Sequence, residues 1–137
     1  MNLPKTVYLA SLGCSKNRVD SELLLGILKN AGIVPVGNPA RAELIVVNTC
    51  GFIEPAKEES IDTLFEMARY KETGKCRVLL ATGCLTQRYG EALAADMPEV
   101  DAFLGVSQYD KALWAISEAM SGARPLIKDE NKGFLEG

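Results

Sequence analysis

Short runs of aliphatic residues alternate along this chain with longer segments in which apolar residues recur at helical spacing. The aliphatic runs predict strands at residues 6–11, 33–36, 44–48, 77–82 and 102–106. The longer segments predict helices at about residues 19–31, 55–70, 86–95 and 110–120. Such alternation favours an α/β fold with a parallel sheet, because parallel strands need crossover connections that are usually helical.

Five strands in this rhythm predict a flavodoxin-like or Rossmann-like three-layer sandwich with the strand order 2-1-3-4-5. The helical spacing also predicts which side chains face the core. In chain order they are Val19, Leu23, Leu24, Ile27 and Leu28, then Ile61, Leu64, Phe65 and Ala68, then Tyr89, Ala92 and Leu93, then Leu113, Ile116 and Met120. The periodicity fades after residue 122. We therefore expect residues 1–122 to form the domain and residues 123–137 a linker or tail.

Composition indicates a soluble domain with a substantial apolar core. The chain has 137 residues, of which 47% are hydrophobic and 24% charged. Its net charge of −3 argues against direct nucleic-acid binding, which normally needs a basic surface. No apolar run is long enough to span a membrane, and no signal-peptide pattern opens the chain. We therefore expect a cytoplasmic protein without membrane contact.

The chain has four cysteines and no histidine. Cysteines in the cytoplasm usually stay reduced, so these point to metal binding or catalysis before disulfides. The absence of histidine excludes Cys–His and Ser–His nucleophile pairs, and it excludes zinc sites that contain histidine. Any chemistry here must use cysteine, carboxylate, lysine or tyrosine side chains, or a bound cofactor.

Three of the cysteines come directly after predicted strands. Cys14, Cys50 and Cys84 follow the first, third and fourth strands, each shortly before a predicted helix. These strands are neighbours in the predicted sheet, at a spacing of ~4.8 Å, so their carboxyl ends can bring three thiols to one point. Three thiolates suit a 4Fe-4S cluster with one open iron better than they suit structural zinc, which takes four protein ligands. The alternative for each cysteine is a small buried core residue.

Cys76 precedes the fourth strand and should lie at the opposite edge of the sheet, where we interpret it as a structural residue. Two asparagines are candidate cofactor-binding residues. Asn17 lies in the first cysteine loop, where it could hydrogen-bond a thiolate or a bound ligand, or cap the following helix. Asn48 ends the third strand and could satisfy backbone groups of the loop near Cys50.

The sequences around the three cysteines resemble those of the N-terminal domain of the radical-SAM methylthiotransferases. The matching strings are SLGCSKNRVDSE (11–22), NTCGFIEPAKEESI (48–61), TGCLTQRYGEAL (82–93) and PEVDAFLGV (98–106). The strings SKN after the first cysteine and GFI after the second are similar to one branch of this family. That branch methylthiolates an aspartate of a small-subunit ribosomal protein, whereas the tRNA-modifying branch has different residues at these positions.

The resemblance implies an auxiliary 4Fe-4S cluster held by Cys14, Cys50 and Cys84, with Cys76 outside the ligand set. It also implies a second 4Fe-4S cluster and S-adenosylmethionine, both bound by a radical-SAM domain of the same protein, and a ribosomal protein as substrate. No CxxxCxxC motif for the second cluster occurs in this sequence. We therefore expect a fragment of a transferase that is inactive alone. Two alternatives stay open, namely the same domain of a tRNA methylthiotransferase and a metal-free flavodoxin-like binding module.

Overall fold

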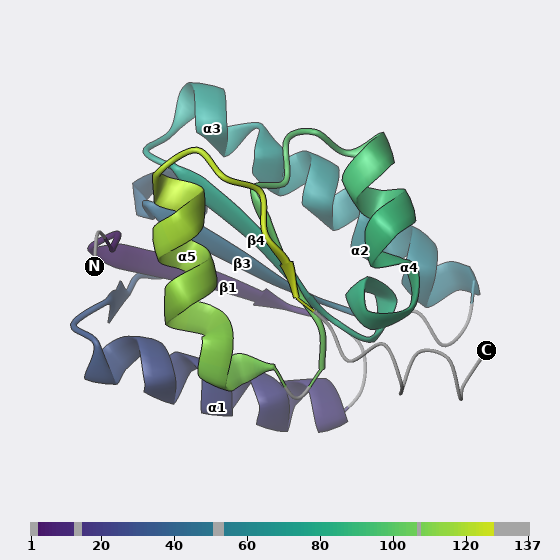
Figure 1. The fold of residues 1–137 in the computed structure, drawn as a ribbon, viewed down its shortest axis with the longest axis horizontal. Coiled ribbons are helices and arrows are strands. Elements are labelled where there is room, and N and C mark those ends of the chain that lie inside the picture. The colour runs from purple at the N-terminus through teal and green to yellow at the C-terminus, as the bar shows by residue number, and fades with distance from the viewer. Residues whose placement is uncertain (1–2, 13–14, 51–53, 107, 128–137) are drawn as a thin grey trace.

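A parallel sheet forms the centre of this computed structural model, which describes residues 3–12, 15–50, 54–106 and 108–127 (Figure 1). Its strands are β1 (Thr6–Ser11), β2 (Val34–Pro35), β3 (Leu44–Thr49), β4 (Val78–Gly83), β5 (Ala102–Leu104) and β6 (Leu126–Ile127). All neighbouring strands pair in parallel, in the order β2-β1-β3-β4-β5-β6. The predicted α/β class, the parallel sheet and the order of the first five strands are confirmed.

Helices cover both faces of this sheet. They are α1 (Ser15–Asn30), α2 (Glu54–Ala68), α3 (Tyr70–Thr73), α4 (Cys84–Asp96) and α5 (Ala112–Met120), with 3-10 turns η1 (Pro39–Arg41) and η2 (Tyr109–Lys111). Helices α1 and α5 lie on one face, and α2 and α4 lie on the other (Figure 1). None of the helices in the described ranges is both long and apolar enough to cross a bilayer.

The sheet separates two hydrophobic cores, because successive residues of a strand point to opposite faces. Val46 and Leu80 belong to the core beneath α1 and α5, whereas Ile45 and Leu79 belong to the core beneath α2 and α4. Strands β3 and β4 are buried along their whole length. This two-sided burial explains why the sequence of β3 is a continuous apolar run rather than an alternating one.

Strand β6 is a sixth strand, where the sequence predicted five. It lies within residues 123–137, the segment predicted to be a linker or tail. Phe103 pairs with Leu126, and Leu104 pairs with Ile127. A strand of two residues is too short to produce an alternating pattern, so only its pairing with β5 defines it.

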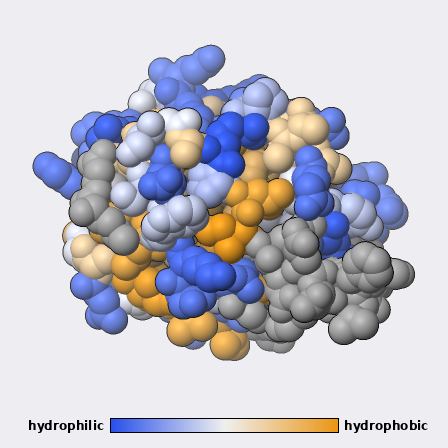
Figure 2. Space-filling model, in the orientation of Figure 1, coloured by the Kyte–Doolittle hydropathy of each residue, from blue (hydrophilic) through white to orange (hydrophobic). Residues whose placement is uncertain are grey.

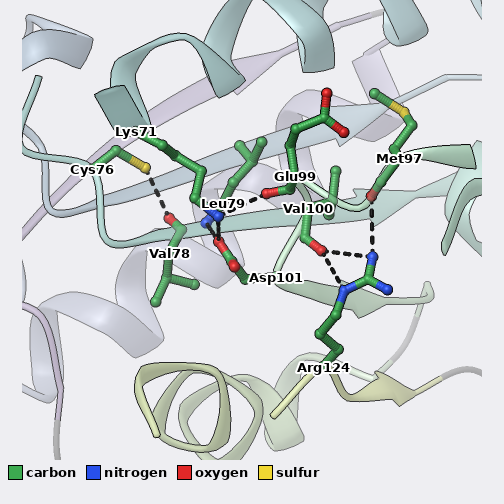
Figure 3. Close-up of polar contacts among 9 residues, drawn as sticks. All are labelled: Lys71, Cys76, Val78, Leu79, Met97, Glu99, Val100, Asp101 and Arg124. Atoms are coloured by element: carbon green, nitrogen blue, oxygen red, sulfur yellow. Dashed lines mark hydrogen bonds and ion pairs between the residues drawn. The ribbon is translucent and has the colours of Figure 1, made fainter. Parts of the chain in front are cut away.

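Arg124 fixes the segment that leads into β6. Its guanidinium donates hydrogen bonds to the carbonyl oxygens of Met97 and Val100 at 3.0 to 3.1 Å (Figure 3), and to that of Ala94 at 3.2 Å. Ala94 lies in the last turn of α4, and Met97 is its C-terminal cap residue. Carbonyl groups at a helix C-terminus have no partner within the helix, so the arginine satisfies acceptors that α4 leaves open.

Some helical side chains that were predicted to face the core are exposed instead. They are Val19 (63% exposed), Leu23 (56%), Phe65 (47%), Tyr89 (39%) and Ala92. Figure 2 shows hydrophobic surface along the lower edge of the view, where α1 runs. The predictions for Leu24, Leu28, Leu64, Leu93 and Ile116 are confirmed, because these side chains are buried.

Two of the helices were predicted wrongly for the same reason, which is that α1 and α2 each turn a partly polar face to the sheet, whereas α4 is distorted. Helix α1 buries Ser21 together with Leu24 and Leu28, and this choice leaves Val19 and Leu23 outside. Helix α2 similarly buries Ser60, Leu64 and Met67, so Phe65 points outward. In α4 the backbone departs from helical geometry at Tyr89, with φ −124° and ψ 24°, and the helix turns beyond that point.

Candidate metal centre

The carboxyl ends of β1, β3 and β4 lie in register at one edge of the sheet. Ser11 pairs with Asn48, Asn48 pairs with Thr82, and Thr49 pairs with Gly83. Cys50 directly follows Thr49, and Cys84 directly follows Gly83. The two cysteines therefore occupy equivalent places just past the ends of adjacent strands. Cys14 comes three residues after Ser11 and lies outside the described residues, as does the side chain of Asn17.

Cys50 is held through its backbone by a serine of the next helix. The Cys50 N–H donates to Ser60 Oγ at 2.8 Å, and the same hydroxyl donates to the Cys50 carbonyl oxygen at 2.9 Å. Ser60 is fully buried in α2, and Cys50 is 5% exposed. One hydroxyl therefore satisfies both backbone groups of a residue that has left the sheet ladder.

Cys84 is the first residue of α4 and is partly exposed. The residue before it, Gly83, has a φ of +99°, a conformation that residues with a β-carbon rarely adopt. Because Gly83 has no side chain, it cannot cap the helix itself. The Thr49 hydroxyl donates to the Thr82 carbonyl oxygen at 2.6 Å and accepts a long hydrogen bond, 3.4 Å, from the Thr86 N–H. Thr49, on the neighbouring strand β3, thus provides a hydrogen-bond acceptor for a backbone N–H in the first turn of α4.

Asn48 connects the end of β3 to the first loop and helix. Its Nδ2 group donates to Ser21 Oγ at 2.8 Å, and Ser21 Oγ donates to Ser11 Oγ at 3.0 Å. The backbone carbonyl oxygen of Asn48 accepts a hydrogen bond from the Leu12 N–H at 3.1 Å. These contacts connect the end of β3 to the end of β1 and to α1, and bonding of Asn48 to the loop backbone near Cys50 stays a prediction. A role in cofactor binding stays a prediction for Asn17 and Asn48.

Cys76 lies at the opposite edge of the sheet, before β4, as the sequence indicated. It is buried, and its Sγ atom donates to the Val78 carbonyl oxygen at 3.3 Å (Figure 3). Burial raises the pKa of the Cys76 thiol to about 11. Nearby, Lys71 Nζ forms an ion pair with Asp101 Oδ2 at 2.6 Å, and Asp101 also accepts from the Leu79 N–H at 2.9 Å. This arrangement is structural and separate from the other cysteines.

Sequence reasoning missed several polar residues that support the cysteine edge. Ser21 and Ser60 are buried on α1 and α2. The only sign of this in the sequence is that each serine stands close to apolar residues at helical spacing. Tyr109 was also missed, because it precedes the predicted last helix. Burial raises the pKa of Tyr109 to about 12, and the Asp20 carboxylate adds to the rise.

The donor set fits a thiolate-ligated iron–sulfur cluster. None of the three cysteines in the described ranges forms a disulfide, and two of them, Cys50 and Cys84, lie just past the paired ends of β3 and β4. Thiolate sulfur is the ligand that iron–sulfur clusters take most often. Within the described ranges no group of three or more His, Cys, Asp or Glu residues could hold a metal ion. The third predicted ligand, Cys14, lies outside those ranges.

Sequence similarity to known proteins covers most of the chain. Residues 6–105 match the model of a family described as "Uncharacterized protein family UPF0004". The "Ribosomal protein uS12 methylthiotransferase RimO" of Myxococcus xanthus is 57% identical over 126 residues, which are 92% of this chain and 26% of the relative. Proteins of the same name from Heliobacterium modesticaldum and Clostridium botulinum are 50% and 51% identical, over 90% and 96% of this chain and 27% and 30% of the relatives.

The chain thus spans between a quarter and a third of the length of these relatives. The matched region contains β1 to β5 and all three cysteines of the candidate centre. From this match, the chain belongs to the UPF0004 family, and its resemblance to the N-terminal domain of the ribosomal-protein methylthiotransferases is confirmed.

Proposed function

We propose that this chain is the auxiliary 4Fe-4S domain of an enzyme that methylthiolates an aspartate of a small-subunit ribosomal protein. Its ligands are Cys14, Cys50 and Cys84. The observation that carries the proposal is the register of the sheet, which puts Cys50 and Cys84 one residue past a paired Thr49 and Gly83. The names of the relatives, which specify ribosomal protein uS12, favour this substrate over tRNA.

When bound, a cluster with three protein ligands supplies one open iron at which a sulfur species can be held for transfer. The chain's own residues provide the thiol ligands and the backbone that carries them. Cys84 lies in the first turn of α4, where backbone N–H groups and the helix dipole favour an anionic ligand. Cys84 is partly exposed, as contact of the cluster with a substrate or with another domain requires.

The rest of the proposed enzyme lies in the longer protein. A radical-SAM domain with a second 4Fe-4S cluster and S-adenosylmethionine would supply the radical chemistry and the methyl group. This chain has no CxxxCxxC motif for that cluster, so by itself it should not modify the ribosomal protein. We propose that the segment after residue 127 leads toward that domain.

Anaerobic reconstitution with iron and sulfide tests the cluster assignment. We would record the visible spectrum and the iron and sulfide content of the wild type, a Cys76→Ala variant and a triple variant in which Cys14, Cys50 and Cys84 become alanine. A brown protein with about four irons, unchanged in Cys76→Ala and lost in the triple variant, supports the proposal. A folded wild type that stays colourless, or a triple variant that binds equally, contradicts it and favours a metal-free module.

The substrate is tested with the full-length protein. Incubation with S-adenosylmethionine, a reductant and the ribosomal protein should add the mass of one methylthio group in place of one hydrogen on an aspartate. Intact-protein and peptide mass spectrometry would detect the change. Modification of tRNA but not of the ribosomal protein would contradict the proposed substrate and leave the cluster assignment standing.

A further inference from the structure

The backbone of Cys50 depends on one hydroxyl group. Strand β3 ends at Thr49, so the N–H and carbonyl groups of Cys50 lie beyond the sheet ladder. Ser60 Oγ accepts from the first at 2.8 Å and donates to the second at 2.9 Å. The distances are those of ordinary hydrogen bonds, and all of the groups are buried.

The position of Ser60 in its helix makes this contact informative. Serine is a poor choice for the buried face of a helix, because its hydroxyl needs a partner and it contributes little apolar area. Here Ser60 is fully buried and shares that face with Leu64 and Met67. The presence of serine at this buried position is explained if its hydroxyl group holds the backbone of Cys50 in place.

Cys84 depends in a comparable way on Thr49. The fully buried Thr49 hydroxyl bonds the Thr82 carbonyl oxygen at 2.6 Å and the Thr86 N–H at 3.4 Å, which lie on either side of Cys84 in the sequence. The positive φ of Gly83 directs the chain from the strand into α4 at this point. Thr49 therefore spans the turn on which Cys84 is carried.

We infer that Ser60 and Thr49 are positioning residues for the cluster, the first acting through Cys50 and the second through Cys84. The inference rests on the proposed function and assigns a role to two hydroxyl groups that would not themselves be ligands. Because ligand geometry must be held closely for a metal site to form, loss of either hydroxyl should weaken iron binding without removing a sulfur atom.

The test uses the 137-residue chain and two readouts. The first is the alkylation rate of each cysteine in the folded, metal-free protein, followed by peptide mass spectrometry. The second is the iron retained after reconstitution when a chelator is added. In Ser60→Ala we expect Cys50 to be alkylated about tenfold faster, because the turn opens more often, while Cys76 changes less than about twofold. We also expect Ser60→Ala to lose iron to the chelator faster than the wild type.

Three further variants separate positioning from general destabilisation. Thr49→Val removes the hydroxyl at nearly constant volume and should lose iron faster, whereas Thr49→Ser keeps the hydroxyl and should behave like the wild type. Asp101→Ala weakens the opposite edge, so it should speed alkylation of Cys76 but not of Cys50. If Ser60→Ala fails to fold, the Thr49 pair still tests the inference for Thr49, with the alkylation rate of Cys84 as its metal-free readout.

The outcomes distinguish the two proposals. If the wild type binds no iron, the proposed function itself fails. If the wild type binds iron, and Ser60→Ala and Thr49→Val retain it equally well with unchanged alkylation of Cys50 and of Cys84 respectively, the cluster assignment stands and the positioning inference is overturned. Loss of iron in Thr49→Ser as large as in Thr49→Val would also overturn it for Thr49.

Discussion

The backbone of Thr49 lies so close to Gly83 that the sheet leaves no room for a β-carbon at position 83. An added β-carbon would stand 2.8 Å from the Thr49 nitrogen and closer still to its carbonyl oxygen, and 2.5 Å from Asn48 Oδ1. Gly83 also has a φ of +99°. Gly83 immediately precedes Cys84, a proposed cluster ligand. A change of backbone conformation or packing at Gly83 should therefore displace Cys84.

The first prediction is that Gly83→Ala lowers the free energy of unfolding by about 3 kcal/mol, from backbone strain and overpacking together. The matched control is Gly122→Ala, because Gly122 has a φ of +98° but nothing within 4 Å of an added β-carbon. It should lose only about 1–2 kcal/mol, the contribution of strain alone. Urea unfolding measures both values, and equal losses in the two variants would contradict the packing argument.

The second prediction concerns the outward face of α1. Val19 and Leu23 are more than half exposed, so Val19→Ser and Leu23→Ser should each change the free energy of unfolding by less than about 0.5 kcal/mol. Leu24, the next residue along, is 1% exposed, and Leu24→Ala should cost about 2–5 kcal/mol. Thermal or urea unfolding provides the comparison. A large loss in Leu23→Ser would mean that the helix face is oriented differently.

The sheet could be predicted from sequence because its central strands, β3 and β4, are buried on both faces. The run Leu44–Val47 has no polar break, and such a run between helical segments is typical of a central parallel strand. The placement of Cys50 and Cys84 followed from the same alternation. Since neighbouring parallel strands end at one edge, the chain order of strands and cysteines was enough to bring these two together.

The buried faces of the helices were harder to predict than the strands. Helical spacing identifies a stripe of apolar residues along a helix, but it does not show which side of that stripe contacts the sheet. On α1 the polar Ser21 occupies a buried position, where it accepts a hydrogen bond from Asn48 at the end of β3. On α2 the buried Ser60 serves Cys50. These are contacts between residues far apart in sequence, and a hydrophobicity pattern treats each serine as outward-facing. Strand β6 was missed for a related reason, because it depends on pairing with β5.

The third prediction is that Arg124 and β6 are part of the folded domain, which therefore extends past the predicted boundary at residue 122. Arg124→Ala should lower the free energy of unfolding by about 1–2 kcal/mol, since it leaves helix-terminal carbonyls without their charged donor. Arg124→Lys should recover only part of this loss, because an ammonium cannot span the same acceptors.

Truncation after Gly122 should cost more than Arg124→Ala. It also removes the β6 ladder and Leu126, which packs against Gly90 of α4. Arg77→Ala, at an exposed arginine elsewhere, is the control and should change stability little. If the truncated chain unfolds at the same urea concentration as the full chain, the boundary at residue 122 is correct after all.

The fourth prediction follows from the buried thiol of Cys76. Its pKa is raised by burial from 9.0 to about 11, so the folded state holds this proton more tightly than the unfolded chain does. The corresponding stability is fully present below pH 9 and is lost as the pH rises toward 11, with a total on the order of 2 kcal/mol. Urea unfolding of the wild type across this interval, compared with Cys76→Ala, isolates the effect, because every other side chain is the same in both. The wild type should lose stability more steeply than the variant. Parallel pH profiles would show that the Cys76 thiol is not protected from ionisation, and would argue against its buried, structural role.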